Sequence, residues 1–207
     1  MTLESFELPR LDVPLLGATG RLVGLPPVFL RDARTGERPR LATALRVGLR
    51  EDSLLVRFDG RDDGVVASLK RNHSPLWTED VFEVFLSPVE PPSRYYEFEV
   101  NPLGAVWTGR VESPDLDRRT MRVESSWRCR GFSARVVVAA PRRWSAVLRV
   151  PLAPMVGGAV PYRWRANFYR IDRGSVDAYS AWSPTLAEPP DFHIPERFGF
   201  LTLPTRT

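Results

Sequence analysis

The sequence predicts an all-β protein, a two-sheet antiparallel β-sandwich of the immunoglobulin-like or jelly-roll type with about 9–11 strands. Three observations support this class. The chain has many short runs of aromatic and β-branched residues, but no long segment with the periodicity of a helix. Its 20 prolines and 14 glycines are spread along the chain, as in proteins whose short strands alternate with turns. Its 207 residues suit one large all-β domain.

The clearest predicted element is a β-hairpin near the middle of the chain. Its two strands are expected over residues 81–86 and 95–100, which are rich in aromatic and β-branched residues. The segment between them, residues 87–94, contains Pro88, Pro91 and Pro92 and can continue neither a helix nor a central strand. We therefore expect a long loop between the two strands.

Further short strands are predicted on both sides of this hairpin. Residues 1–25 contain Leu-Pro and Val-Pro steps and are expected to lie extended along the surface or edge, with the core built from residues 26–207. No repeat or linker is apparent, so residues 1–207 are interpreted as a single domain. A short helical turn is expected at 65–70, and a helix start or turn at 151–154. The other strands are predicted at residues 43–49, 53–59, 120–123, 132–139, 145–150, 162–171, 179–182 and 199–203.

Side-chain alternation within the hairpin predicts which of its faces is buried. Successive residues of a strand point to opposite sides of the sheet, so Phe98 and Val100 share an apolar face. Glu97 and Glu99 share the opposite face. If Glu83 of the first strand lies on that face as well, carboxylates come together, and directly opposed like charges destabilise a sheet. We therefore expect arginines, a cation or a hydroxyl-rich ligand beside them.

Composition and charge argue against several classes of function. The formal net charge is +4, with Lys70 as the one lysine, and the arginines alternate with acidic residues, so nucleic-acid binding is not expected. Cys129 is alone, which excludes an internal disulfide and a thiolate metal site. No run approaches the ~18 apolar residues of a membrane span, so no membrane contact is expected. The amino end lacks the pattern of a signal peptide, and we expect a cytoplasmic protein, with an extracellular role left open.

Signals for catalysis are weak. Glu97 and Glu99 are a carboxylate pair of the kind used in glycoside cleavage, but acids that alternate along a strand are typical of a solvated face. His73 and His193 belong to no metal or catalytic motif. We therefore predict no catalytic residue and no enzyme activity. A structural calcium ion stays open as a cofactor, because hard oxygen ligands lie near several strand ends. These ligands are Asp59, Asp62, Asp63 and Asp80.

Aromatic and polar residues together predict a carbohydrate site. Trp77 and Trp182 each lie in a loop flanked by proline. An indole face suits the C–H patch of a pyranose ring, while carboxylates, amides and guanidinium groups suit its hydroxyls. The alternative is that both tryptophans belong to the core. The polar candidates on the expected outer face of the strands are Glu83, Glu97, Glu99, Arg165, Asn167 and Tyr169.

Residues 40–203 resemble the family 9 carbohydrate-binding modules, and more closely the bacterial family 9-like proteins related to the DOMON domains. Five segments in order carry the resemblance: PLWTEDVFEVFL (75–86), YEFEVN (96–101), RANFYRID (165–172), YSAWSP (179–184) and PERFGFL (195–201). The resemblance implies a β-sandwich that binds sugars in a lectin-like manner, without catalysis.

The resemblance also implies roles for particular residues. Trp77 and Trp182 match the two tryptophans between which the family holds a sugar. Glu83 matches its ligand-binding glutamate, and Asn167 falls near an amide that contacts sugar. The chain departs from the family at Glu99, which stands where the modules carry an arginine. Tyr179 likewise replaces a polar residue.

The function predicted from the sequence is therefore noncovalent binding of a mono- or oligosaccharide. Glu97, Glu99, Arg165 and Tyr169 are expected to form a second tier around the main contacts. Two alternatives stay open. One is a sandwich with a purely structural or protein-interaction role. The other is a haem-binding domain like some DOMON relatives, which needs axial ligands. The candidate axial ligands are Met121, Met155, His73 and His193.

Overall fold

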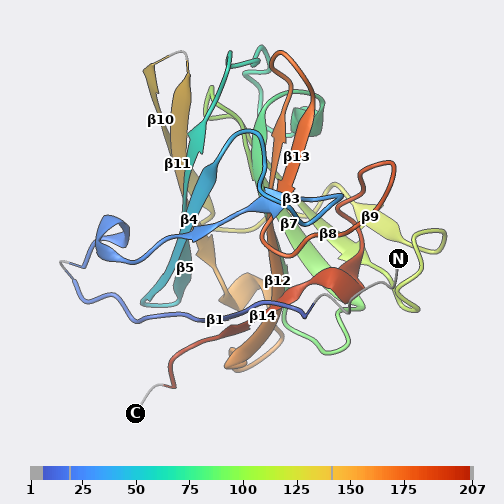
Figure 1. Ribbon diagram of the computed structural model, residues 1–207. Helices are drawn as coiled ribbons and strands as arrows, with labels where there is room; N and C mark the ends of the chain where they lie inside the picture. The colour runs from blue at the N-terminus through green and yellow to red at the C-terminus, as the bar shows by residue number, and fades with distance from the viewer. Residues whose placement is uncertain (1–6, 19, 141, 206–207) are drawn as a thin grey trace.

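The protein is a sandwich of two β-sheets, seen in a computed structural model that describes residues 7–18, 20–140 and 142–205 (Figure 1). The predicted fold class is confirmed. These described residues contain fourteen strands, more than expected, because several edge strands of two or three residues carry too little pattern to be recognised. Within them, no helix is long and apolar enough to cross a membrane.

The larger sheet, sheet A, has nine strands, and its central strands carry the residues discussed below. Its strand β1 runs parallel to β14, and its other pairs are antiparallel. Strand β13 (Ala178–Ala181) pairs with β12 and with β3 (Arg31–Asp32). The main order is β1 (Arg10–Asp12), β14 (Gly199–Thr202), β12 (Arg163–Asp172), β6 (Val81–Ser87), β7 (Arg94–Val100), β8 (Val106–Glu112) and β9 (Arg122–Glu124).

The smaller sheet, sheet B, has five antiparallel strands, which lie on the left in Figure 1. Their order is β10 (Ser133–Ala140), β11 (Arg143–Pro151), β5 (Ser53–Arg61), β4 (Thr43–Arg50) and β2 (Val28–Phe29). Four 3₁₀-helices of three residues lie in the connections: η1 (Leu22–Gly24), η2 (Leu76–Thr78), η3 (Ala153–Met155) and η4 (Pro195–Arg197).

The central hairpin forms as predicted, with β6 and β7 paired antiparallel. The turn predicted at 151–154 corresponds to η3. One local prediction is wrong, one strand is shifted and one strand was missed. The short helical turn expected at 65–70 is irregular backbone, and the turn forms later, as η2. The strand expected at 120–123 is displaced to β9. Strand β8 was not foreseen, because Thr108, Gly109 and Arg110 interrupt its apolar pattern.

The main core lies between the two sheets and is built around stacked aromatic rings. Phe82 of β6 lies between Phe58 of β5, at 4.6 Å between ring centroids, and Trp144 of β11, at 3.8 Å. Phe98 and Val100 of β7 are buried in the same core, as their alternation predicted. Complete burial of each large apolar side chain contributes about 1.5–3 kcal/mol to the stability of the fold.

The opposite face of sheet A is also covered, which the alternation did not predict. A second apolar cluster fills it, in which Phe85 lies 5.6 Å from the ring of Tyr95 and 5.0 Å from that of Tyr169. Phe192 and Phe198, from the connections around η4, pack on this cluster. Sheet A is therefore buried on both sides near its centre, and the polar residues of its outer face are enclosed.

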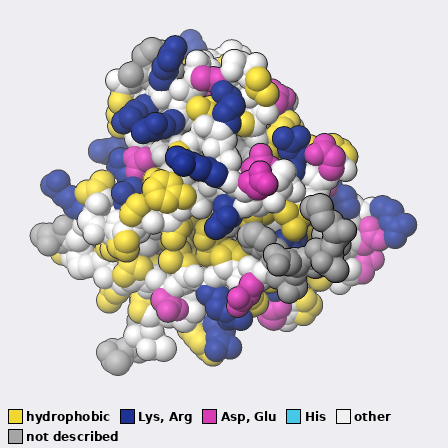
Figure 2. Space-filling model, viewed as in Figure 1, with side chains coloured by type: hydrophobic (Ala, Val, Ile, Leu, Met, Phe, Trp, Pro, Cys, Tyr) yellow, Lys and Arg dark blue, Asp and Glu magenta, His cyan; other side chains and the backbone are white. Residues whose placement is uncertain are grey.

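Charged side chains on the surface are interspersed. On the face seen in Figure 2, basic and acidic groups alternate over the sandwich without a large area of one sign. This distribution agrees with the alternation of arginines and acids along the sequence.

Candidate functional site

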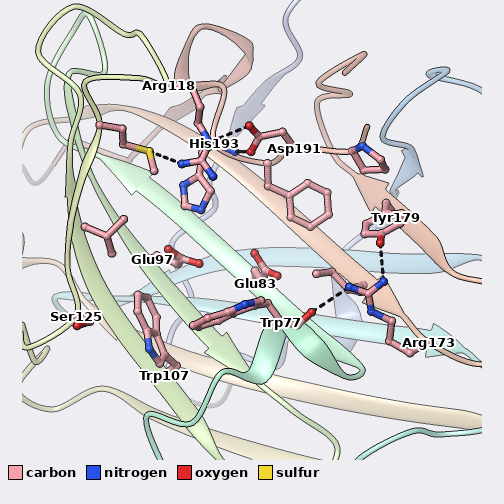
Figure 3. A pocket seen from close by; sticks show the side chains of 15 residues that line it. Trp77, Glu83, Glu97, Trp107, Arg118, Ser125, Arg173, Tyr179, Asp191 and His193 are labelled. Atoms are coloured by element: carbon pink, nitrogen blue, oxygen red, sulfur yellow. Dashed lines mark hydrogen bonds and ion pairs between the residues drawn. The ribbon is translucent and has the colours of Figure 1, made fainter. Parts of the chain in front are cut away.

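A pocket of about 550 Å³ opens on the outer face of sheet A (Figure 3). Glu83 and Glu97 lie at its centre. Trp77 and Trp107 lie on one side of these carboxylates, and loop residues lie on the other. The loop and rim residues that line the pocket include Arg118, Met121, Arg173, Tyr179, Asp191, Phe192 and His193.

Two tryptophans form an aromatic corner of the pocket. Trp77 belongs to η2 and is 43% exposed, whereas Trp107 of β8 is 4% exposed. Their rings meet edge to face, with centroids 5.8 Å apart and planes at 87°. Trp107 lies over Gly109, where a Cβ atom would be 2.2 Å from the ring, so a glycine is needed there. The exposed indole of Trp77 is thus held in place by a buried neighbour.

A row of side chains crosses the outer face of sheet A from strand to strand, at and under the floor of the pocket. Glu83 of β6 is paired in register with Tyr169 of β12 on one side and with Glu99 of β7 on the other. Glu99 is paired in turn with Trp107. Glu97 lies two residues along β7 from Glu99, on the same face. The structure therefore brings together the three carboxylates, as the alternation predicted.

These carboxylates are buried almost completely. Glu83, Glu97 and Glu99 are 2%, 5% and 0% exposed. Oε1 of Glu83 and both carboxylate oxygens of Glu99 are enclosed without a hydrogen-bond donor from any other described side chain or backbone group. Buried acceptors without donors are costly, so this floor is unusual for a purely structural sheet.

Burial raises the pKa of all three carboxyl groups. It raises the pKa of Glu97 to about 7 and those of Glu83 and Glu99 well above the ordinary value, and the charge of Glu97 raises the last two further. The interaction between Glu97 and Glu99 lowers the pKa of Glu97 and raises that of Glu99, which therefore holds the proton. Near neutral pH some of these carboxyl groups are therefore protonated, and the floor carries fewer than three negative charges.

The free energy of unfolding should therefore depend on the protonation of Glu97. Between about pH 4.5, where the unfolded carboxyl titrates, and about pH 7, the folded state binds more protons, so stability falls as the pH rises. Glu97→Gln removes this contribution. We expect the variant to gain on the order of 1–3 kcal/mol relative to the wild type between pH 5 and pH 8, measured by urea unfolding.

Neighbouring groups do not obscure this comparison, because it uses the difference between variant and wild type at each pH. Burial lowers the pKa of His193 to about 4, which makes its own contribution to stability rise with pH. Burial raises the pKa of Asp80 to about 6, which acts in the same direction as Glu97. Identical pH profiles for wild type and variant would contradict the assigned burial of the Glu97 carboxylate.

The rim arginines are held by their own partners. Nε of Arg118 donates to Asp191 at 2.9 Å. Arg173 donates to Asp177, to the hydroxyl of Tyr179 and, at 3.2 Å, to the carbonyl of Trp77. Both guanidinium groups act on the carboxylates of the floor through space: Arg118 lowers the pKa of Glu97 and Arg173 that of Glu83.

Trp182 is not part of this pocket, so its predicted role as the second aromatic wall is corrected. It lies in the core between the sheets, with its ring 5.5 Å from that of Phe168. It begins the segment after β13, and its backbone N–H donates to the carbonyl of Phe168. The second tryptophan of the pocket is Trp107, which the prediction missed.

Three of the predicted polar contacts are already satisfied elsewhere and do not line the pocket. The amide of Asn167 donates to Ser183 and Tyr169, and the hydroxyl of Tyr169 donates to the carbonyl of Phe192 at 2.9 Å. Arg165 pairs with Glu90 at 2.9 Å and lines a different cavity. Glu99 is fully buried beside Glu83 under the floor of the pocket and does not line the cavity. Of the predicted residues, Trp77, Glu83 and Glu97 line the pocket.

The loop residues of the pocket were missed because they carry no periodic pattern. Arg118, Asp191 and His193 lie in irregular connections, and each is placed by tertiary contacts. Nδ1 of His193 lies 2.8 Å from the hydroxyl of Tyr95 on β7. One sequence feature could have pointed to the pocket: His193 lies between two apolar residues in a proline-rich loop. The same feature also fits an ordinary loop histidine.

The haem alternative is disfavoured by the placement of its candidate ligands. His193 and Met121 both line the pocket, but both contact the hydroxyl of Tyr95, at 2.8 and 3.3 Å. They therefore lie on the same side and do not face each other across the cavity. Met155 lies in the core between the sheets, and His73 is outside the pocket lining.

The predicted calcium ligands are divided between separate places. Asp62 and Asp63 lie with Asp172, their carboxylate oxygens within 4.8 Å of one another. Arg170 already pairs with Asp62 and Asp172, and Arg40 with Asp63. The other two predicted ligands, at positions 59 and 80, bind arginines and backbone N–H groups respectively. The calcium ion stays a prediction.

Comparisons with solved structures identify the same fold. A candidate carbohydrate-binding protein from Bacteroides uniformis is similar, with a TM-score of 0.75 and 18% identity, over 96% of this chain and 100% of the other. A family 9 carbohydrate-binding module from Caldicellulosiruptor kristjanssonii, solved with cellotriose, has a TM-score of 0.64 and 15% identity, over 96% of this chain and 95% of the other.

Comparisons of the sequence found a similar protein and a matching family. A protein of Arthroderma benhamiae described as extracellular is 27% identical over 179 residues, which are 78% of this chain and 78% of the other. The sequence model of carbohydrate-binding family 9 matches residues 36–203, most of the chain, in agreement with the resemblance in the sequence motifs. The protein therefore belongs to carbohydrate-binding family 9.

Proposed function

We propose that the protein binds a carbohydrate noncovalently in this pocket, with a pyranose ring against Trp77 and its polar groups on Glu83 and Glu97. The observation that carries the proposal is an exposed indole in one cavity with the buried carboxyl groups of Glu83 and Glu97, where Oε1 of Glu83 has no donor. Binding sites for small ligands have this composition, apolar walls with a few polar groups, and volumes of about 300–1,000 Å³. The sugar offers the hydroxyl donors that the floor lacks.

The family supports this proposal. The module from Caldicellulosiruptor kristjanssonii has been solved in complex with cellotriose and with glucose. A glucose-configured sugar is therefore a reasonable first ligand to test on this chain. In this chain the buried Trp107 supports Trp77, while Trp182, which the resemblance implied as the second tryptophan at the sugar, lies in the core.

The geometry favours binding over cleavage. The two carboxyl groups of a glycosidase flank the scissile bond. Glu83 and Glu97 instead lie on neighbouring strands of one sheet face, and both form the floor of the same pocket. We therefore propose that the protein has no hydrolytic activity on its ligand.

A titration with sugars tests the proposal. Glucose, cellobiose and xylobiose are added to the wild type and to Trp77→Ala, with heat and tryptophan fluorescence recorded. We expect saturable binding by the wild type and a loss of about tenfold or more in affinity, about 1.4 kcal/mol, in the variant. Because Trp77 is 43% exposed, its removal should leave thermal unfolding nearly unchanged.

A matched control is Tyr162→Ala, which removes an aromatic ring that is 51% exposed and lies outside the pocket. This variant should bind like the wild type. Equal affinity of wild type and Trp77→Ala for a sugar that binds would show that the ligand lies elsewhere on the protein.

A further inference from the structure

The floor of the pocket has carboxyl groups without cationic partners, which bears on the kind of sugar that fits. Glu83, Glu97 and Glu99 are each buried, and none of the ion pairs between described residues includes any of them. Oε1 of Glu83 is without a donor, and Glu83 lines the pocket, where Figure 3 shows its carboxylate toward the cavity.

The arginines of the rim act on this floor through space but form no ion pair with it. Arg118 is paired with Asp191, and Arg173 with Asp177, so each brings its own countercharge. Both are side chains of the rim, while the floor lies deeper on the sheet. The enclosed space therefore presents carboxyl groups to a ligand. The arginines at its edge are already paired with other carboxylates.

A neutral sugar satisfies such a floor only in part. Its hydroxyls can donate hydrogen bonds to Glu83 and Glu97, but they bring no charge into a place from which water is excluded. An ammonium group brings three donors and a positive charge, and charge-assisted hydrogen bonds are roughly twice as strong as neutral ones. A ring that covers Trp77 also excludes solvent, which strengthens the attraction between the ammonium and the carboxylates.

We infer that the pocket prefers a sugar with a free, positively charged amino group, such as a 2-amino-2-deoxyhexose, whose ammonium lies on Glu83 and Glu97. This inference rests on the proposed function, because the sugar ring is held by Trp77 in both. The aromatic corner contributes to the same preference, since an indole face attracts a nearby cation. Acetylation of the amino group removes its charge and two of its donors, and should remove the preference.

A calorimetric comparison of three sugars tests the inference. Glucosamine, N-acetylglucosamine and glucose are titrated into the full chain at about pH 6.5, where the free amine is protonated. We expect glucosamine to bind about tenfold or more tightly than either neutral sugar. Because the ammonium favours the ionised carboxylates, binding should also release protons, seen as a heat that depends on the ionisation enthalpy of the buffer.

Variants identify the groups responsible. Glu83→Gln and Glu97→Gln keep the size of the side chain and remove its charge, so each should bring the ratio of the glucosamine and glucose affinities to within about threefold. The matched control is Glu112→Gln, a carboxylate paired with Arg94 outside the pocket, which should keep the wild-type ratio. Thermal unfolding of each variant is recorded in parallel, so that a change in ratio is read only from folded protein.

The outcomes separate this inference from the proposed function. Tight binding of neutral sugars without a preference for glucosamine overturns the inference and leaves the proposed function standing. Failure of all three sugars, with no response to cellobiose or xylobiose, overturns both. Cyclohexylamine that binds as tightly as glucosamine would show that the pocket selects an amine and not a sugar, which also overturns the inference.

Discussion

Replacing Arg170 with alanine is expected to lower the free energy of unfolding by about 3–5 kcal/mol. Arg170 of β12 is 1% exposed and lies on the core side of sheet A. Its guanidinium donates to Asp62 at 2.9 Å, to Asp172 and to the carbonyl of Arg61, and it bonds the hydroxyl of Thr43 at 3.1 Å. Alanine leaves two carboxylates buried without their cation. Guanidinium chloride unfolding measures the effect.

Two comparisons show whether the buried charges are the cause. Arg94→Ala removes an arginine that is half exposed and paired with Glu112 at 2.8 Å, and should cost less than about 1 kcal/mol. The triple variant Arg170→Met with Asp62→Asn and Asp172→Asn removes all three charges together, and should recover part of the loss. An Arg170→Ala variant no less stable than Arg94→Ala would contradict the burial of this ion-pair network.

The central hairpin shows what side-chain alternation can predict. A shift of one residue in register would exchange the two faces of a strand, so alternation strongly constrains which residues are buried. Phe98 and Val100 therefore face sheet B as predicted, and Glu97 and Glu99 share the opposite face with Glu83. The predicted meeting of carboxylates follows from this local rule.

Alternation says nothing about what covers a face. The outer face of sheet A is enclosed by connections that carry Phe192, His193 and Phe198, and their placement depends on contacts between distant parts of the chain. Strand β8 was missed because its row through Trp107 includes Gly109, whose lack of a side chain lets the tryptophan lie flat there. Without this strand, Trp107 was not recognised as a wall of the pocket. The order of motifs along the chain pointed to Trp182 instead.

Trp182→Ala is expected to lower the free energy of unfolding by about 3–5 kcal/mol, because it opens a large cavity in the main core. The ring is 6% exposed, lies 5.5 Å from that of Phe168, and covers Gly199 so closely that a Cβ atom there would be 2.5 Å from it. Chemical denaturation of the purified variant gives the loss directly. Trp77→Ala, the removal of an exposed indole, is the matched control and should cost less than about 1 kcal/mol.

Trp182→Ala and Trp77→Ala together also decide whether Trp182 is a core residue or a wall of the pocket. If the ring belongs to the core, Trp182→Ala is much less stable than the wild type, yet the fraction that remains folded at low temperature keeps its affinity for sugar. If the ring is a wall of the pocket, the variant keeps its stability and loses its ligand, as Trp77→Ala should. The contacts with Phe168 and Gly199 support the first result, because a side chain that fills the space between two sheets is not available to stack on a sugar.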